Sequence, residues 1–408
     1  MTERDWEREN TSGGEVPAEG DTAPADRAPA DGEVGAEESS VPAAESAVKP
    51  PKKKKLSNIL WNIFLIAVIA IGILSLFGIV KEIDPESGAS FGEVMRGASP
   101  TFFVVLVLIV LITMVLDVSK FCIISKTVTG KVSFATSAKT NFLGRYYDAV
   151  TPFSTGGQPM QIYYLSSKGI SGGNATAMVL IRYFSSIICW ITLGGALMIA
   201  GAAKGVLNGV KGGELLKITG WIGIAINLIV PAFVTFFLLF PKFMYKLTSG
   251  VVKLGHKMKI VKDVEKTTVR AIKVVDDFKN SFRLMAKSPV KLILLLFVCL
   301  LESACTFAIP YFVMKAFSCP GVDGMLLSIM SLNVYATFGV SFIPTPGNSG
   351  VVEGLGALAF SAAAGAALVW SVITWRLAVF YIYIFIGIGI TVYDVIAKNV
   401  KYKKQKER

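Results

Sequence analysis

The sequence predicts an all-α polytopic integral membrane protein with about six spanning helices and two re-entrant broken helices in an inverted repeat. Three observations favour this class: long apolar stretches, a bias of Lys and Arg between them, and two broken segments at matching positions. Of the 408 residues, 53% are hydrophobic and 17% are charged, whereas soluble domains carry roughly 25% charged residues. The composition therefore disfavours an ordinary soluble protein.

The N-terminal segment differs in charge and composition from the rest of the chain. Residues 1–48 hold 13 acidic and 3 basic side chains, a net charge of −10. Because the whole chain has a net charge of +12, residues 49–408 carry +22. Such a polar segment cannot bury enough apolar surface to offset its chain entropy. We expect residues 1–55 to form a disordered acidic cytoplasmic tail that ends in a lysine cluster. A regulatory or partner-binding arm is the alternative.

Six stretches are apolar over the length of about 20 residues that a helix needs to cross a bilayer. They lie near residues 58–80, 101–121, 174–201, 218–240, 290–315 and 368–394. These stretches divide the chain into a first transmembrane repeat at 56–240 and a second at 290–397. Helices buried in a soluble fold are the alternative, but they are rarely this long and this apolar.

The basic residues predict the orientation, because Lys and Arg gather in cytoplasmic loops. Lys52–Lys55 precede the first stretch, the segment 241–291 holds 13 Lys or Arg against four acids, and the tail 398–408 is strongly basic. Both termini are therefore expected in the cytoplasm. The loop 241–289 is expected to be amphipathic and basic, either lying on an anionic leaflet or simply obeying the charge rule. Its expected apolar stripe is Val264, Val269, Ile272, Val275 and Phe278.

Two apolar segments, 141–161 and 333–353, are interrupted by Pro, Gly and polar residues. Asn, Pro and then Gln or Glu follow one another at the same spacing in both. Three crossings separate the segments, so the second should be inverted relative to the first, as in many transporters. Broken backbone at membrane depth must be buried in protein or line a wet cavity; plain interfacial loops are the alternative. The expected hinge residues are Pro152, Gly156, Gly157, Pro344, Pro346, Gly347 and Gly350.

Ionisable and amide side chains at membrane depth are the candidate site, because such residues are costly there and usually functional or paired. Arginine suits bidentate contact with a phosphate. A purely structural role, in which buried ion pairs fix the register of the helices, is the alternative. The residues expected to line a lipid-binding cavity are Arg145, Asp148, Gln158, Gln161, Arg182, Glu302, Asn333, Glu353 and Arg376.

The sequence offers little support for cofactor or metal chemistry. One histidine and five scattered cysteines disfavour a zinc or copper site. We find no P-loop, no dinucleotide-binding glycine motif and no nucleophile–base pair. We therefore expect no cofactor, no metal, no catalytic residue and no direct nucleic-acid partner. The expected partners are membrane phospholipids, and the charge of the cavity arginines favours anionic ones. Assembly into a homo-oligomer is left open.

Two motifs resemble one family. TPFSTGGQPMQIYYLSSKGIS and IPTPGNSGVVEGLGAL look like the transmembrane, flippase-like region of the lysylphosphatidylglycerol synthases, which include the bacterial multiple peptide resistance factor. The resemblance covers roughly residues 55–395. It departs at Gln158 and Gln161, where relatives often show Gly-Glu and then Arg, and at Asn348-Ser349, which replace a double glycine.

The resemblance implies a bacterial plasma-membrane protein that handles phosphatidylglycerol or its aminoacylated form. We expect a lipid translocase that contributes to cell-surface charge and cationic peptide resistance. A lipid lysyltransferase that depends on lysyl-tRNA is the alternative, and it would need a separate soluble partner, because the longest loop is too short for that domain. A small-solute or ion transporter and a non-catalytic scaffold also remain open.

Overall fold

The computed structural model describes residues 89–151, 154–258, 263–341 and 345–406. In this part of the chain every regular element is a helix. The expected acidic tail, the first apolar stretch at 58–80 and the hinge residues Pro152 and Pro344 lie outside the described residues.

Five helices of the described part are long and apolar enough to cross a membrane. They are α3 (Pro100–Thr129), α6 (Gly172–Ala203), α7 (Gly213–Leu239), α10 (Pro289–Ala316) and the run Val351–Asp394. The predicted class, an all-α polytopic membrane protein, is confirmed. Helices α3, α6 and α10 begin one or two residues earlier than predicted, because Ser171 caps α6 and proline occupies the first turn of α3 and α10.

The last predicted span, 368–394, is not one regular helix. It consists of α13 (Leu368–Arg376), the π-helical turn η4 (Leu377–Tyr381) and α14 (Ile382–Lys406). A π-helical turn widens the helix locally and is often found at functional sites. The 3₁₀ turn η3 (Gly365–Ala367) joins α13 to the preceding α12. Apolar length alone predicts none of these irregularities.

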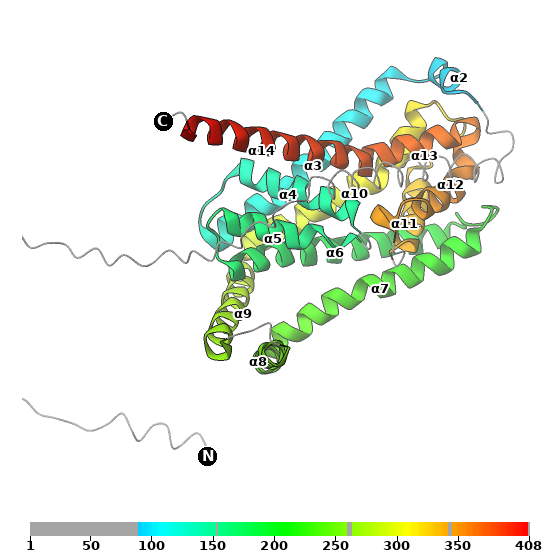
Figure 1. Ribbon diagram of the computed structural model, residues 1–408. Coiled ribbons are helices and arrows are strands. Elements are labelled where there is room, and N and C mark those ends of the chain that lie inside the picture. The colour runs from blue at the N-terminus through cyan, green and yellow to red at the C-terminus, as the bar shows by residue number, and fades with distance from the viewer. Residues whose placement is uncertain (1–88, 152–153, 259–262, 342–344, 407–408) are drawn as a thin grey trace, which may run out of the picture. The chain divides into compact units, whose positions relative to one another are not determined.

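Each predicted broken segment is a pair of helices joined by irregular backbone. The first pair is α4 (Phe134–Val150) and α5 (Gly157–Ser167); the second is α11 (Leu326–Gly339) and α12 (Val351–Ala364), with the 3₁₀ turn η2 (Pro346–Asn348) between them. The irregular backbone is therefore shorter than the predicted segments. In Figure 1 the first pair lies toward the end of the bundle that carries the C-terminus, and the second lies toward the opposite end. This is the arrangement that an inverted repeat predicts.

The basic loop forms two helices, α8 (Pro241–Lys257) and α9 (Val264–Ala286). A short helix, α2 (Phe91–Arg96), precedes α3 at the other end of the bundle. The apolar stripe expected on α9 is only partly covered by protein: Val275 is buried and Phe278 joins a core cluster with Ala177 and Met178 of α6, whereas Val269 is 63% exposed. A periodic stripe does not by itself reveal which surface covers it.

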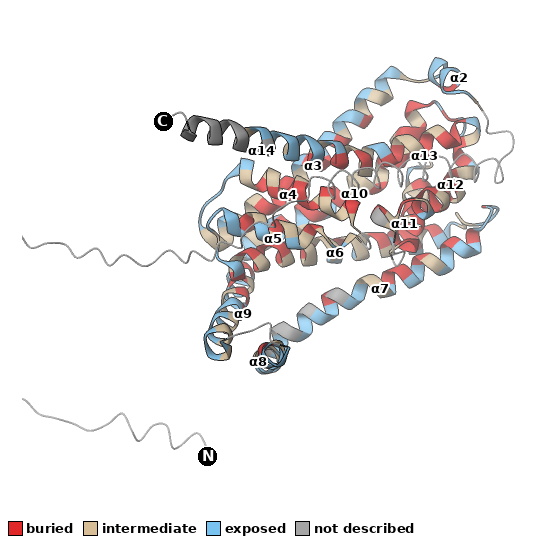
Figure 2. Ribbon diagram, viewed as in Figure 1, coloured by how far each residue is buried: buried red, intermediate tan, exposed pale blue. Residues whose placement is uncertain are grey.

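The main core surrounds the second pair of broken helices. Figure 2 shows buried residues on α11, α12 and α13, whereas α7 is exposed or intermediate along most of its length. The exposed side of α3 carries large apolar residues such as Val104, Leu108 and Val115, as expected of a surface that faces lipid. Helices α7 and α11 approach closely at Gly223, where a Cβ atom would lie 1.9 Å from the Phe338 carbonyl oxygen. Glycine therefore permits backbone contact between helices in the membrane.

Candidate functional site

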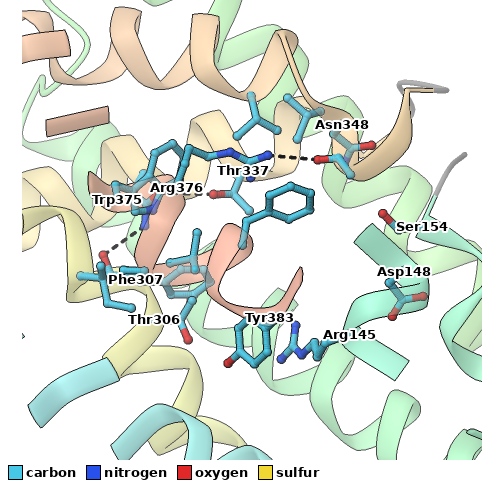
Figure 3. A pocket seen from close by; sticks show the side chains of 18 of the residues that line it. Arg145, Asp148, Ser154, Thr306, Phe307, Thr337, Asn348, Trp375, Arg376 and Tyr383 are labelled. Atoms are coloured by element: carbon cyan, nitrogen blue, oxygen red, sulfur yellow. Dashed lines mark hydrogen bonds between the residues drawn. The ribbon is translucent and has the colours of Figure 1, made fainter. Parts of the chain in front are cut away.

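In the described part of the chain, two cavities of about 370 Å³ and 590 Å³ share part of their lining. Arg145, Asp148 and Glu302 border both of them. So do Ser154 and Asn348, which belong to the irregular backbone of the first and second pair of broken helices. Both broken segments therefore meet at one polar region, and Figure 3 shows Arg145, Asp148, Ser154 and Asn348 around the smaller cavity.

Ser154 and Asn348 share an unusual backbone conformation. Both are non-glycine residues in the left-handed region, with φ angles of 51° and 56°. This conformation is sterically costly for residues with a Cβ atom and often marks a functional site. The two broken segments therefore present a strained residue to the same polar region.

A buried carboxylate organises the charges at the larger cavity. Asp117 of α3 is fully buried and accepts hydrogen bonds from Arg145 of α4 at 2.9 Å and from Arg182 of α6 at 3.0 Å. Lys120, one helical turn along α3, lies 3.1 Å from the same carboxylate. Three cations from three helices thus surround one acid. This arrangement holds α3, α4 and α6 in register.

Lys120 also connects this cluster to α10. Its ammonium lies 3.1 Å from the Glu302 carboxylate of α10 and 3.3 Å from the Ser186 hydroxyl of α6. Arg145 lies 3.5 Å from the other oxygen of Glu302. Because a buried charge without a partner is costly, these contacts constrain how α10 packs on α3.

A second ion pair, between Arg376 and Glu353, lies next to the irregular backbone between α11 and α12. Arg376 of α13 donates from Nε to Oε1 of Glu353 at 2.8 Å and from Nη2 to the Gly347 carbonyl oxygen at 3.2 Å. Tyr381, in the π-helical turn, donates its hydroxyl hydrogen to the same Glu353 oxygen at 3.1 Å. The other carboxylate oxygen accepts the Gly350 N–H at 2.6 Å. Glu353 therefore joins the break, the start of α12 and the π-helical turn.

Asp148 connects the two helices on either side of the first break. Its carboxylate accepts the backbone N–H of Gly157, the first residue of α5, at 2.8 Å. A Cβ atom at position 157 would lie 2.4 Å from that carboxylate, so glycine is required for the close approach. Asp148 thereby ties the end of α4 to the start of α5.

The structure separates the sequence-predicted cavity residues into two groups. Those that border one or both cavities are Arg145, Asp148, Gln158, Arg182, Glu302, Asn333 and Arg376. The lining does not include Gln161 or Glu353, although Glu353 bonds to Arg376. Gln161 is buried against Gly144 of α4, and its Oε1 has no hydrogen-bond partner among the described residues.

Asn333 donates to the Phe307 carbonyl oxygen at 3.2 Å and so supports the junction of α11 with α10.

The expected hinge residues also differ in position. Gly156 lies just before α5, and Gly157 is its first residue. Gly347 lies in the second break with a φ of 57°, and Gly350 caps α12 with a φ of 90°. Pro346 begins the turn η2. The described hinge residues therefore lie at helix ends, where they interrupt the hydrogen-bond ladder.

Sequence reasoning missed several residues of the site. Lys120 was not among the candidates, although its position three residues after Asp117 would have indicated a paired cation on the same face. Asn141 was treated as part of a broken segment, but it lies inside α4 and accepts a hydrogen bond from Arg182 at 2.9 Å. Tyr383 borders the smaller cavity, with its ring 5.4 Å from the Arg145 guanidinium.

The site is polar but nearly balanced in charge. The linked cluster of Asp117, Glu302, Lys120, Arg145 and Arg182 has a net charge of +1 from three cations and two acids, and Asp148 brings the total to zero. Arg145 is 35% exposed, whereas Lys120 and Asp117 are at most 1% exposed. The buried members thus pair with one another, whereas the Arg145 side chain, which pairs with Asp117 and Glu302, is partly exposed and borders both cavities.

These observations define a multi-pass α-helical membrane protein in which two broken helical segments enclose a charged cavity. The family model of the lysylphosphatidylglycerol synthase transmembrane region matches residues 62–387. The chain belongs to this family, and the resemblance noted in its two motifs is confirmed. The curated proteins show no significant match to the sequence.

Proposed function

We propose that the protein is a lipid translocase that moves phosphatidylglycerol, or its aminoacylated form, between the leaflets of a bacterial plasma membrane. The observation that carries the proposal is the position of Arg145. Its side chain is partly exposed and borders both cavities. Arginine binds phosphate through two parallel hydrogen bonds, so it suits the phosphate of a lipid headgroup.

The distribution of charge supports a lipid rather than a simple anion. Arg145 supplies donors for a phosphate, while Asp148 and Glu302, which border the same cavities, supply acceptors for hydroxyl or ammonium groups. Glycerol hydroxyls or an attached amino acid would meet those acceptors. The balanced total charge also lowers the cost of a charged cluster in the membrane.

The two cavities suggest a path. Thr155 and Gln158, near the start of α5, border only the larger cavity, and Gly347 of the second break borders only the smaller one. Ser154 and Asn348, one from each break, border both. In this proposal a headgroup passes from one broken segment to the other while Arg145 holds its phosphate. The end of the bundle with α8, α9 and the basic C-terminal tail faces the cytoplasm, because Lys and Arg collect there. Movement of such lipids would alter cell-surface charge and resistance to cationic peptides.

The test is translocation of fluorescent phosphatidylglycerol in proteoliposomes, followed by dithionite quenching. Arg145→Gln is compared with wild type and with Lys139→Gln, a matched control on the same helix whose ammonium pairs with Asp394. Arg145→Gln leaves Asp117 with two cations, so the fold should survive. We expect at least about a tenfold loss of rate, the effect of losing roughly 1.4 kcal/mol of a charge-assisted contact.

The control is expected to keep the wild-type rate, because Lys139 borders neither of the two cavities. Folding of each variant is checked by thermal stability in detergent. Absence of translocation in well-folded wild type would contradict the proposal. Equal rates in wild type and Arg145→Gln would keep translocation but reject Arg145 as the phosphate contact.

A further inference from the structure

The helix α8 has three faces with different surroundings, and one of them packs on protein. Met244 packs on the core cluster that α6 and α9 form, and Val252 is buried. Tyr245 donates its hydroxyl hydrogen to Asp276 of α9, and this carboxylate raises the pKa of the tyrosine. These contacts fix how α8 is rotated about its own axis.

The second face is an exposed apolar stripe. Its members recur every three or four residues, so they lie on one side of a helix with 3.6 residues per turn. They are Phe243, Leu247, Val251, Leu254 and Met258, with exposures of 48%, 44%, 60%, 57% and 62%. This exposed stripe of α8 is too regular and too apolar to be an ordinary solvated surface.

The exposed stripe continues the lipid-facing surface of a spanning helix. The Phe236 ring near the end of α7 lies 4.8 Å from the Phe240 ring and 5.6 Å from the Phe243 ring. Phe233 and Phe236 of α7 are 59% and 43% exposed, as expected of side chains in contact with acyl chains. The apolar surface therefore turns from α7 onto α8 without interruption.

The orientation of α8 suits a helix at the membrane surface. Figure 1 shows α8 almost along its axis, whereas α3, α6, α7 and α10 run across the view. α8 thus lies at a large angle to the spanning helices, at the end of α7.

The third face is basic and adjoins the stripe. Lys242, Lys246, Lys253 and Lys257 are all exposed and recur at intervals of four, seven and four residues. Successive residues turn by about 100° around a helix, so these lysines form one row beside the apolar stripe. A row of ammonium groups next to an apolar stripe matches an anionic bilayer surface, with phosphates above and acyl chains below.

We propose that α8 docks on the leaflet at its end of the bundle and recognises anionic lipid headgroups there. The apolar stripe enters the boundary between headgroups and acyl chains, and the four lysines contact phosphates. This surface lies on a different element from the two cavities, so the proposal does not depend on the translocase function. A second copy of the chain, seated on the same stripe, is the competing occupant.

Site-directed spin labelling of the full chain tests the depth of α8. The native cysteines are replaced by alanine, and a nitroxide is attached at Val251→Cys in the stripe or at His256→Cys on the opposite side of the helix. The protein is placed in nanodiscs of phosphatidylcholine, with or without phosphatidylglycerol. We expect the label at 251 to collide with oxygen but not with a water-soluble nickel chelate, and the label at 256 to show the reverse.

The anionic lipid is expected to increase this contrast, and high salt to reduce it, because exposed charges are screened. A chelate-accessible label at 251 would overturn the proposal. So would dipolar broadening between labels at 251, which would indicate a second copy. The same contrast with and without phosphatidylglycerol would overturn the assignment to an anionic surface.

A second measurement, limited proteolysis, needs no label and therefore keeps the native cysteines. Trypsin cleavage after Lys246 and Lys253 of the wild-type chain should be slower in nanodiscs that contain phosphatidylglycerol. Lys246→Gln is expected to weaken the lipid dependence of cleavage after Lys253 by about fivefold, the effect of one lysine near an anionic surface. Lys273→Gln, on the exposed side of α9, is the matched control and should leave it unchanged. Equal cleavage in both lipids would overturn the proposal.

Discussion

The Lys120 ammonium lies 3.1 Å from the Glu302 carboxylate, and both side chains are at most 2% exposed. This contact joins α3 to α10 at the edge of the larger cavity. Glu302→Gln removes the charge of one partner and leaves a buried cluster with an excess of cations. Breaking such a pair costs about 3–5 kcal/mol. We therefore expect a clearly lower melting temperature in detergent.

The double variant Lys120→Met/Glu302→Gln separates loss of this pair from general damage to the helices. It restores the net charge of +1 that the cluster has in the wild type. We expect it to be more stable than Glu302→Gln alone, because partners in one network do not contribute additively. Strictly additive losses of stability would show that the two side chains are not coupled.

The close approach of α7 and α11 at Gly223 gives a second prediction. A Cβ atom there would lie 1.9 Å from a backbone oxygen of Phe338, and backbone cannot move aside as a flexible side chain does. Gly223→Ala is expected to destabilise the protein by about 1–3 kcal/mol. Gly195→Ala is the control, since no heavy atom lies within 4 Å of that Cβ position. An equal change in melting temperature for both variants would contradict the packing.

The class of fold was predictable because it depends on length and average composition. An apolar stretch such as 290–315 is too long for an ordinary helix of a soluble fold, so it indicates a membrane span. The structure places α10 there within one residue at each end. Pro and Gly likewise indicated both broken segments, because they remove or weaken helical hydrogen bonds. These signals are local in the sequence.

The contacts within the site were not predictable, because they depend on how helices rotate against one another. Nothing near Lys120 in the sequence reveals that Glu302, 182 residues away, supplies its second carboxylate. The same limit applies to α9, where Val275 and Phe278 of the regular stripe are buried but Val269 is exposed. It also explains Glu353, which was expected in the cavity but faces Arg376 and Tyr381.

Glu353 provides a third prediction, because one carboxylate satisfies three donors. Glu353→Ala leaves Arg376 without its carboxylate and leaves the Gly350 N–H without its acceptor. The expected loss is about 3–5 kcal/mol, typical of removing one partner of a buried pair. Glu353→Gln keeps an oxygen acceptor but loses the charge, so its melting temperature should lie between those of wild type and Glu353→Ala. A Gln variant as unstable as the Ala variant would show that charge alone matters.

The last prediction concerns the strained residues in the two breaks. Ser154 has a φ of 51°, a conformation that costs a residue with a Cβ atom about 1–2 kcal/mol. Glycine adopts it freely but loses about 0.5–1 kcal/mol more chain entropy on folding. Ser154→Gly should therefore raise stability slightly, by up to about 1.5 kcal/mol from the difference.

Ser154→Ala removes the hydroxyl but keeps the Cβ atom, so we expect no such gain from it. Asn348→Gly should gain less than Ser154→Gly, because asparagine tolerates the left-handed region better than serine. Thermal unfolding of the three variants in one detergent measures these differences. If Ser154→Ala stabilised the protein as much as Ser154→Gly, the hydroxyl rather than the backbone would be the source of strain. The backbone of the first break would then carry no such strain at Ser154.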